Sequence, residues 1–207
     1  MSIYKEVKSW QRIEGVKLFK DLGLNDNPLI LDYGCGYGHY TFPAARALNY
    51  KGTVFAVDID TKCLHYVKET AADENLSNIK VSLANSNYTL NFSNESLDMI
   101  LYYDLFHGNG YHRFTLLKEA KRTLKYNGIL SLLPFHLSNF KDKTGFIREY
   151  SYDEIIEEIL EYGFIRLNTQ PKIGIHFDKY PIPTYISNND IDFQELERGE
   201  ILTFIKK

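Results

Sequence analysis

One segment, LDYGCGYGHYT at residues 31–41, constrains the possible folds of this chain more than any other. It follows the apolar run at residues 29–31 and precedes a helical pattern. Gly34, Gly36 and Gly38 permit positive φ angles and let a ligand approach the backbone closely. A helix that follows such a turn offers free N–H groups to an anionic group. The segment therefore predicts a strand–turn–helix unit with a ligand site at the carboxyl edge of a sheet.

The rest of the chain alternates short β-rich runs with helical patterns. We expect strands at residues 29–31, 53–57, 79–83, 97–103, 129–133, 164–167 and 201–205. We expect helices at residues 3–22, 41–49, 61–75, 112–125 and 152–162, the last after a Ser151–Glu154 capping box. This alternation predicts an α/β fold, a doubly wound and mostly parallel seven-stranded sheet of the Rossmann-like methyltransferase type.

The end of the chain departs from the alternation. Residues 171–200 contain three prolines and many Asn and Asp, and we expect them to be irregular. Because no helix precedes the run at residues 201–205, the last strand is predicted to insert antiparallel beside its predecessor. Without repeats or linkers, the 207 residues are expected to form a single domain, an N-terminal helical cap (1–24) on a core (28–207). The cap either packs on the sheet or serves as a lid.

Composition narrows the classes of function. The formal net charge of −3 argues against a large nucleic-acid footprint, which needs a basic patch. The first residues carry charges every few positions rather than the apolar core of a signal peptide, and no apolar run reaches membrane-spanning length. Cys35 and Cys63 form no disulfide framework or metal motif. We expect a soluble, cytoplasmic protein.

Two acidic residues make the glycine turn a more specific sequence signal. Asp32 stands two residues before Gly34, and Asp58 ends the second predicted strand, 22 positions after Gly36. The spacing G-x-G-x-G differs from the G-x-G-x-x-G of dinucleotide binders. A carboxylate at the end of the second strand can accept hydrogen bonds from ribose hydroxyls. Taken alone, the turn could be only a turn and Asp58 only a helix cap, so the signal lies in the combination.

Asp-x-Gly-x-Gly-x-Gly followed by Val-Asp-Ile resembles class I S-adenosylmethionine-dependent methyltransferases, most closely the small-molecule group that includes quinone-biosynthesis enzymes. The resemblance covers residues 29–133 well and 151–206 more loosely. It implies that S-adenosylmethionine is the cofactor. It further implies that Asp32 and Gly34 hold the methionine ammonium, directly or through water, and that Gly36 and Gly38 give the cofactor room.

The same resemblance implies that Asp58 binds the ribose and that Ile59 packs on adenine. The family usually places an Asp after the third strand, where it bonds the adenine amino group. Here Ser86 takes that position with Asn85 beside it, and either side chain can accept the same hydrogen bond. Tyr103, at the end of the fourth strand, is the remaining predicted cofactor contact.

The loop after the fourth strand is the candidate catalytic face, because the resemblance places it beside the transferable methyl group. We predict His107 as a general base or an acceptor-orienting group, with Asp104 as its helper. The alternative is that His107 caps or packs against the following helix. His136 follows the fifth predicted strand on the same edge of the sheet and is expected near the substrate. His112, His136 and His176 share no metal-ligand spacing with His107, so no metal site is predicted.

The loop lacks the Pro-Pro-aromatic motif of enzymes that methylate exocyclic base amines. Together with the mild acidity, this favours a small-molecule acceptor and no nucleic-acid or membrane partner. Two other readings stay open: a nicotinamide oxidoreductase, against which the glycine spacing argues, and a non-enzymatic S-adenosylmethionine-binding subunit that regulates or supports a partner. Asp32 and Asp58 fit such a subunit as well as an enzyme, because their expected role is to bind the cofactor and not to catalyse methyl transfer.

Overall fold

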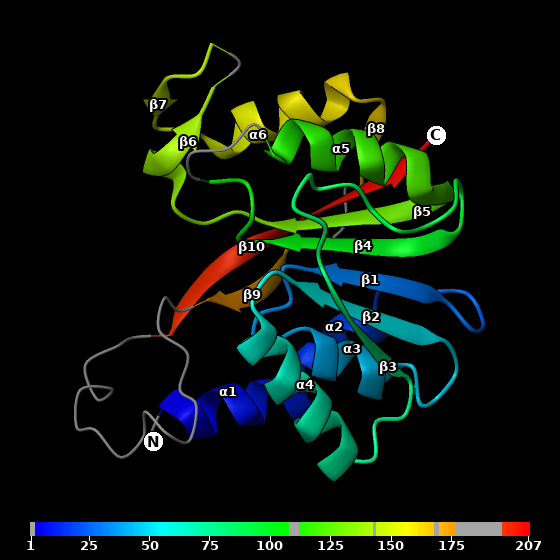
Figure 1. Cartoon of the computed structure of the whole chain (residues 1–207). Coiled ribbons are helices and arrows are strands. Elements are labelled where there is room, and N and C mark those ends of the chain that lie inside the picture. The colour runs from blue at the N-terminus through cyan, green and yellow to red at the C-terminus, as the bar shows by residue number, and fades with distance from the viewer. Residues whose placement is uncertain (1–2, 108–111, 143, 168–169, 177–195) are drawn as a thin grey trace.

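A twisted, mostly parallel sheet forms the centre of the computed structural model, which describes residues 3–107, 112–142, 144–167, 170–176 and 196–207. Its strands follow the order β3-β2-β1-β4-β5-β10-β8, and β9 pairs with β10 outside this path (Figure 1). The strands of this sheet are β1 (Leu29–Tyr33), β2 (Thr53–Asp58), β3 (Ile79–Leu83), β4 (Leu97–Tyr103), β5 (Leu124–Leu133), β8 (Phe164–Arg166), β9 (Lys172–His176) and β10 (Glu197–Lys206).

The direction of the strands matches the prediction from sequence. Neighbouring strands from β3 to β5 run parallel, whereas β10 runs antiparallel to both β5 and β8. The seven-stranded main path with an inserted antiparallel last strand is therefore confirmed. Because β1, β2 and β4 are neighbours and parallel, their carboxyl ends meet at one edge, which is where ligands bind in such sheets.

Helices cover both faces of the sheet, as right-handed crossovers require (Figure 1). α5 (His112–Thr123) and α6 (Tyr152–Glu161) lie on one face. The other face carries α1 (Ile3–Arg12), α2 (Glu14–Lys20), α3 (Thr41–Ala47) and α4 (Thr61–Asp73). A short 3-10 helix, η1 (Leu137–Asn139), leads into a separate two-stranded ribbon of β6 (Phe140–Lys141) and β7 (Ile147–Arg148). Among the described residues, no helix is long and apolar enough to cross a membrane.

Local signals in the sequence set the helix ends. The side chain of Asp60 accepts a hydrogen bond from the Lys62 backbone at 2.8 Å and caps α4. Ser151 and Glu154 form the predicted capping box at the start of α6. Gly163 follows α6 with φ 79°, a conformation that favours glycine after a helix end.

The predicted continuous helix over residues 3–22 is wrong. The chain breaks at Ile13, whose side chain is exposed, and continues as the separate helix α2. The break lets Gly15 lie against Trp10 and Pro43, where an added Cβ would approach their side chains to 2.8 and 2.9 Å. Close packing of α2 on α1 and α3 thus decides against one straight helix.

The prediction that residues 171–200 are irregular is also wrong for its described parts. Lys172–His176 form β9, which pairs antiparallel with the first half of β10, and β10 itself begins at Glu197. Gly174 lies where an added Cβ would approach the Tyr40 hydroxyl to 2.5 Å, so β9 is packed closely against the glycine loop. Pro181 and Pro183, which suggested irregularity, lie outside the described residues.

The connection between β3 and β4, residues 84–96, crosses the sheet without a helix. Two side chains of α5 hold it. The Glu119 carboxylate accepts a hydrogen bond from the Leu90 backbone at 2.7 Å, and the Arg122 guanidinium donates to the carbonyls of Leu90 and Phe92. This connection carries Asn85 and Ser86 to the carboxyl edge of the sheet.

Candidate active site

The glycine loop continues the β1 backbone directly into α3. The N–H groups of Gly34 and Cys35 both donate to the Val57 carbonyl, at 2.7 and 3.1 Å. Gly34, Gly36 and Gly38 all have positive φ angles, 76°, 48° and 78°, which glycine adopts without strain. At Gly34 an added Cβ would also lie 2.4 Å from the Leu105 side chain, so the loop has no room for a larger residue there.

Asp32 lies at the end of β1 with its carboxyl group buried. The Thr41 hydroxyl, at the start of α3, donates to it at 2.5 Å. Burial raises the pKa of Asp32 to about 7, against the lowering effect of the Thr41 hydrogen bond and with a further rise from nearby Asp58. A cationic ligand would stabilise the ionised form of this buried carboxyl group, so the site favours binding of a positive charge.

Asp58 holds the glycine loop from the neighbouring strand. Its carboxylate accepts hydrogen bonds from the Gly36 N–H at 2.8 Å and from the Asp60 N–H at 2.9 Å. A carboxylate offers about four lone-pair positions, so two backbone bonds leave room for further donors. Asp58 therefore does more than the helix cap that the sequence left as an alternative: it ties the two predicted cofactor segments together.

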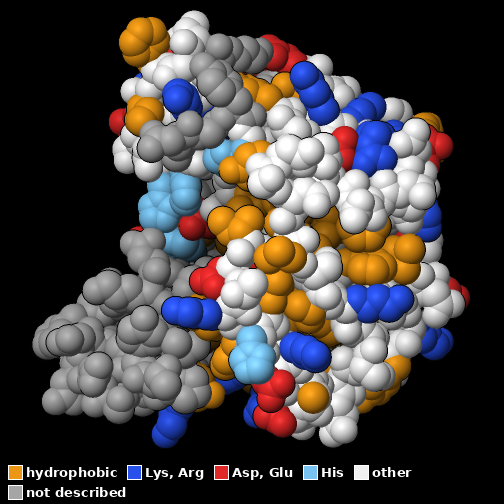
Figure 2. Space-filling model, in the orientation of Figure 1, with side chains coloured by type: hydrophobic (Ala, Val, Ile, Leu, Met, Phe, Trp, Pro, Cys, Tyr) orange, Lys and Arg blue, Asp and Glu red, His pale blue; other side chains and the backbone are white. Residues whose placement is uncertain are grey.

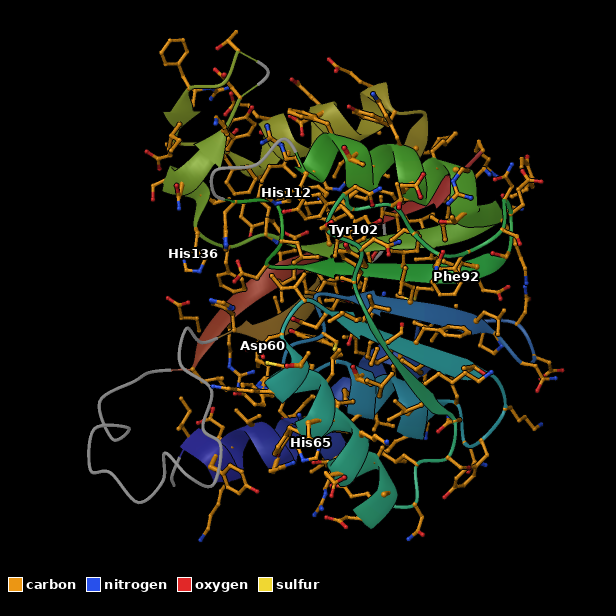
Figure 3. The ribbon with its side chains drawn as sticks, in the orientation of Figure 1. Asp60, His65, Phe92, Tyr102, His112 and His136 are labelled. Atoms are coloured by element: carbon orange, nitrogen blue, oxygen red, sulfur yellow. The ribbon has the colours of Figure 1, made fainter. Side chains whose placement is uncertain are left out.

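On the predicted catalytic face, Asp104 follows β4 and is surrounded by three histidines. Its carboxylate oxygens lie 3.4 Å from Nδ1 of His107, 3.5 Å from Nε2 of His136 and 3.6 Å from Nδ1 of His176. Figure 2 shows histidine side chains gathered at one edge of the molecule, and Figure 3 places His136 there, beyond the end of β5. His136 lies on the edge where it was expected, whereas no feature of the sequence indicated that His176 also reaches Asp104.

The fourth, His112, lies apart from this group. It begins α5 and its Nε2 hydrogen-bonds with the Leu105 carbonyl at 2.6 Å, so it holds the loop that carries Asp104.

β9 brings His176 to the site, and Tyr40 of the glycine loop holds β9 in place. The Tyr40 hydroxyl donates to the Ile175 carbonyl at 2.8 Å and accepts from the Ile175 N–H at 2.7 Å. The His176 ring stacks on Phe135 with centroids 4.2 Å apart. A segment 135 positions from the glycine loop thus completes the same edge of the sheet.

Residues 30–128, which contain both acids and all three glycines of the loop, match the family model described as a methyltransferase domain. Over these residues the chain carries an S-adenosylmethionine-dependent methyltransferase domain. S-adenosylmethionine is accordingly the cofactor of this domain. No curated protein matches the chain significantly.

The methyltransferase fold extends over the whole chain. A solved S-adenosylmethionine-dependent methyltransferase from Aquifex aeolicus superposes with a TM-score of 0.67 at 17% identity, covering 98% of each chain. Precorrin-6y C5,15-methyltransferase from Geobacter metallireducens gives 0.58 at 17% identity, covering 94% of this chain and 87% of that one. The [4+2]-cyclase SpnF gives 0.63 at 17% identity, covering 92% and 80%. At such identities the likeness concerns the fold, which hosts more than one chemistry.

The residues expected around adenine lie together at the open edge of this methyltransferase. Ile59 is 74% exposed, although it is a large apolar side chain next to Asp58. Asn85 donates from its amide to the Thr89 carbonyl at 2.9 Å and so closes the turn that presents Ser86, which is exposed. Beneath this turn lies a hollow of about 350 Å³ that reaches Asn85 and Tyr33. Tyr33 is the clearest residue there that the sequence analysis missed, because its hydroxyl is buried without a hydrogen-bond partner.

Tyr103 is buried behind the site rather than open at its surface. Its hydroxyl hydrogen-bonds with that of Ser131 at 2.8 Å, and its ring packs edge-on against Tyr40 at 4.3 Å between centroids. It nevertheless lines a small hollow of about 50 Å³ together with Asp32, Gly34, Asp104 and His176. The predicted cofactor residues and the histidine cluster therefore face the same space.

Neither cysteine offers a nucleophile to this methyltransferase. Cys35 and Cys63 are buried free thiols. Burial raises the pKa of Cys63 to about 12 and raises that of Cys35 well above its usual value. His39, which also lines the small hollow, stays neutral because burial lowers its pKa to about 3.

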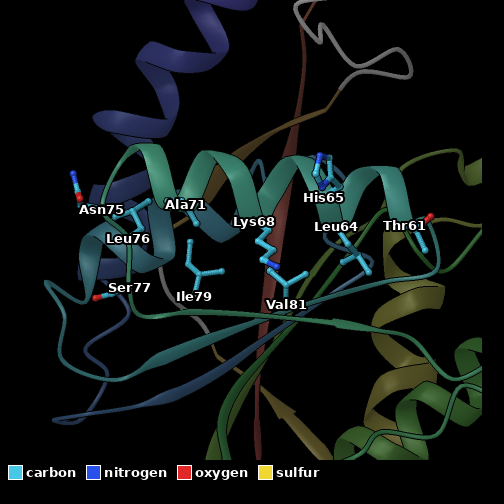
Figure 4. Close-up of a pocket in the computed structure, with 11 residues that line it drawn as sticks. Thr61, Leu64, His65, Lys68, Ala71, Asn75, Leu76, Ser77, Ile79 and Val81 are labelled. Atoms are coloured by element: carbon cyan, nitrogen blue, oxygen red, sulfur yellow. The ribbon is translucent and has the colours of Figure 1, made fainter.

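A larger hollow of about 770 Å³ lies away from this edge, between α4 and the edge strand β3 (Figure 4). Its lining includes His65, Lys68 and Val81. None of the predicted cofactor or catalytic residues borders it, so its size does not make it the reaction site.

Proposed function

We propose that this methyltransferase transfers the methyl group of S-adenosylmethionine to a small-molecule acceptor held between Asp104 and the three histidines. The observation that supports this most directly is the hollow shared by Asp32, Gly34 and Asp104, because it joins the cofactor loop to a cluster of proton-accepting side chains. The net charge of −3 speaks against a nucleic-acid acceptor. The name of the precorrin methyltransferase gives a structural neighbour with a small-molecule acceptor.

Within this proposal each cofactor residue has one task. Asp32, with Gly34, holds the methionine ammonium, and the buried carboxyl group suits a cation. Asp58 binds the ribose hydroxyls with its remaining lone pairs. Ile59 covers one face of adenine, while Asn85 or Ser86 accepts from the adenine amino group.

When bound, the cofactor supplies a methyl group on a sulfonium whose C–S bond breaks toward sulfur as an acceptor lone pair attacks the methyl carbon. The chain's own part is alignment, which contributes about 7–11 kcal/mol in well-oriented reactions. Where the acceptor must lose a proton, His107 takes part in removing it, and Asp104 orients His107 or the acceptor.

The proposal extends to the organisation of the chain. Trp10 of α1 packs edge-on against Tyr40, with centroids 5.2 Å apart, and Arg46 of α3 donates to the Gln11 carbonyl. These contacts support one domain over residues 1–207, in which the N-terminal helical cap rests on the glycine loop. The free buried thiols and the mild charge are consistent with a cytoplasmic location.

Calorimetry and a thermal-shift series test the cofactor assignment. We expect S-adenosylmethionine and S-adenosylhomocysteine to bind and raise the melting temperature, and NAD to do neither. Radiolabelled methyl transfer to a panel of metabolites then tests catalysis. Binding without transfer to any class of acceptor would favour the regulatory, non-enzymatic role; binding of NAD alone would refute the cofactor site.

Asp58→Ala should weaken S-adenosylmethionine binding by about ten-fold or more. The reason is the loss of charge-assisted hydrogen bonds to ribose, each of which contributes about 1.5–3 kcal/mol. Titration calorimetry of the wild type and the variant measures this directly. Because Asp58 also anchors Gly36, Asp60→Ala serves as the matched control: it removes the cap of α4, costs about 0.5–2 kcal/mol of stability, and should leave cofactor affinity unchanged. Equal affinity in Asp58→Ala and wild type would contradict the assignment.

Cofactor affinity should depend on pH through Asp32. Its pKa of about 7 in the ligand-free protein lies above the usual 3.8, so below pH 7 the ammonium must displace a proton to meet a carboxylate. Affinity should therefore rise up to about ten-fold per pH unit toward pH 7 and level off above it. The stability of the ligand-free protein should change with pH in the opposite direction. Between about pH 4 and 7 the folded state keeps a proton on Asp32 that the unfolded state has lost, so the contribution of Asp32 to stability falls as pH rises through this range.

S-adenosylhomocysteine titrations between about pH 5.5 and 7.5 check this dependence. Asp32→Asn is the matched variant, because it keeps the size of the side chain but cannot ionise. It should bind weakly with little pH dependence over the same range. A steep pH dependence that persists in Asp32→Asn would assign the titration to another group.

A further inference from the structure

We propose that Asp104, His107 and His136 form a binding site for one divalent zinc ion, with His176 beside it. One ligand atom from each of these three side chains lies within 4.8 Å of the others. The three residues come from the ends of two neighbouring strands, β4 and β5, at the carboxyl edge of the sheet (Figures 1 and 3). The proposal concerns how the acceptor side works and rests on the proposed function only for the role of the ion, not for its binding.

The separations within the cluster suit an ion better than direct hydrogen bonds. The three His–Asp104 separations, 3.4, 3.5 and 3.6 Å, exceed the usual hydrogen-bond length of about 2.7–3.2 Å. Ligand atoms about 2.0–2.1 Å from a tetrahedral zinc ion are about 3.3–3.4 Å apart, which is the edge of that tetrahedron. The cluster is therefore spaced as a ligand set is, with small adjustments on binding.

Backbone conformation aims two of the ligands at each other. Asp104 and His136 both have left-handed backbone angles, with φ of 52° and 53°. Such angles are uncommon outside glycine and persist where the surrounding structure fixes them. The Asp104 N–H donates to the Leu133 carbonyl at 2.8 Å, which locks the ends of β4 and β5 together beside the cluster. The loops thus turn their side chains inward at a position that is held from both strands.

Burial and outer contacts also fit a metal site. Oδ1 of Asp104 and Nδ1 of His107 are shielded from solvent. The far ring nitrogen of His176, Nε2, lies 3.9 Å from the Glu197 carboxylate of β10. Because His176 lies beside the three ligands, the Glu197 carboxylate adds negative charge near the cluster, which favours a cation.

The types of the three ligands indicate which ion would bind and what it would do in the reaction. Two imidazoles and one carboxylate suit zinc, and catalytic zinc sites have three protein ligands and keep a position for a small molecule. Because Asp104 and His176 also line the hollow of the glycine loop, this position would face the methyl donor. An ion there favours an acceptor hydroxyl or thiol, whose pKa it lowers so that its proton leaves to solvent before methylation. In the zinc-bound protein His107 is a metal ligand and acts on the acceptor through the ion.

Zinc titration of the tag-free protein, stripped with a chelator and then freed of it, tests the site without any activity assay. We expect one Zn²⁺ per chain by calorimetry and by elemental analysis of dialysed protein. His136→Gln and His107→Gln should each weaken zinc binding by more than about 100-fold, since even outer-shell changes cost about 10–100-fold. His65→Gln, which changes a histidine on α4 remote from the cluster (Figure 3), is the matched control and should bind zinc like the wild type.

Cobalt substitution supplies a second readout. Co²⁺ bound by the wild type should give the visible absorption of a four- or five-coordinate site, and the two ligand variants, shown to be folded by their circular dichroism, should lack it. Absence of stoichiometric zinc binding, or equal affinity in wild type, His107→Gln and His136→Gln, would overturn the proposal. S-adenosylmethionine binding is measured on the same samples: cofactor binding without zinc binding refutes this site alone, whereas zinc binding without cofactor binding refutes the proposed cofactor site instead.

Discussion

His107→Gln is expected to lower the rate constant of methyl transfer by about 10²–10⁴-fold once an acceptor is found. Gln keeps the approximate size and polarity of the side chain but can neither accept a proton near neutral pH nor replace imidazole as a good zinc ligand. The affinity for S-adenosylmethionine should stay nearly the same, because His107 faces Asp104 on the proposed acceptor side and not Asp58, the proposed ribose-binding residue. Single-turnover kinetics and cofactor calorimetry on the same preparation measure both quantities.

Stability measurements separate this outcome from simple misfolding. His65→Gln makes the same chemical change on α4 and should leave turnover and melting temperature close to those of the wild type. If His107 only packs in its loop, His107→Gln should instead lose about 0.5–3 kcal/mol of stability while the folded fraction turns over normally. That result would remove His107 from both the base role and the zinc site.

The arrangement of the proposed cofactor residues was predictable because its signals are local in sequence. The order strand, glycine turn, helix, strand and acid specifies a parallel βαβ unit, and register then fixes where the acids lie. Tyr33 pairs with Val57, so Asp32 and Asp58 reach the same edge without any further information. The second role of Asp58, which anchors Gly36, is visible only in the structure, because sequence alone does not show which backbone N–H groups donate to its carboxylate.

The acceptor half was not predictable for the opposite reason. Asp104 and His107 are three positions apart, but His136 and His176 reach them only because β5 lies beside β4 and β9 pairs with β10. Sequence spacing carries no record of such packing, so no metal-ligand set was predicted among the histidines. Only His136 was expected at this edge, because it follows β5 and residues after neighbouring parallel strands share an edge. Nothing local identified β9, whose place depends on Tyr40.

Arg113→Met is expected to lower the free energy of unfolding by about 3–5 kcal/mol, the largest stability effect that the structure indicates. Arg113, on α5, is fully buried and forms an ion pair with Glu158 of α6 at 2.8 Å. Its guanidinium also donates to the Tyr150 hydroxyl at 3.0 Å and to the Lys141 carbonyl. Met matches the length of the side chain but leaves Glu158 as an uncompensated buried charge and Lys141 without its donor.

The Arg113 cluster bears on function because of where its partners lie. Arg113 follows His112, which holds the Leu105 carbonyl, and Lys141 lies in the segment that continues from His136. Losing Arg113 should therefore loosen both sides of the histidine cluster at once. We expect the affinity for zinc or acceptor to fall together with stability, while cofactor affinity, set by the glycine loop, changes less.

Urea unfolding followed by circular dichroism measures the loss in free energy, and thermal unfolding should show a fall in melting temperature of about 6–20 °C. Lys17→Met is the matched control: it removes the same charge from a pair with Asp21 that is exposed to solvent and should cost less than about 1 kcal/mol. Adding Glu158→Gln to Arg113→Met removes the stranded charge, so the double variant should be more stable than the sum of the single effects predicts. Simple additivity, or a loss in Arg113→Met no larger than in Lys17→Met, would show that the buried pair does not hold α5 and α6 together.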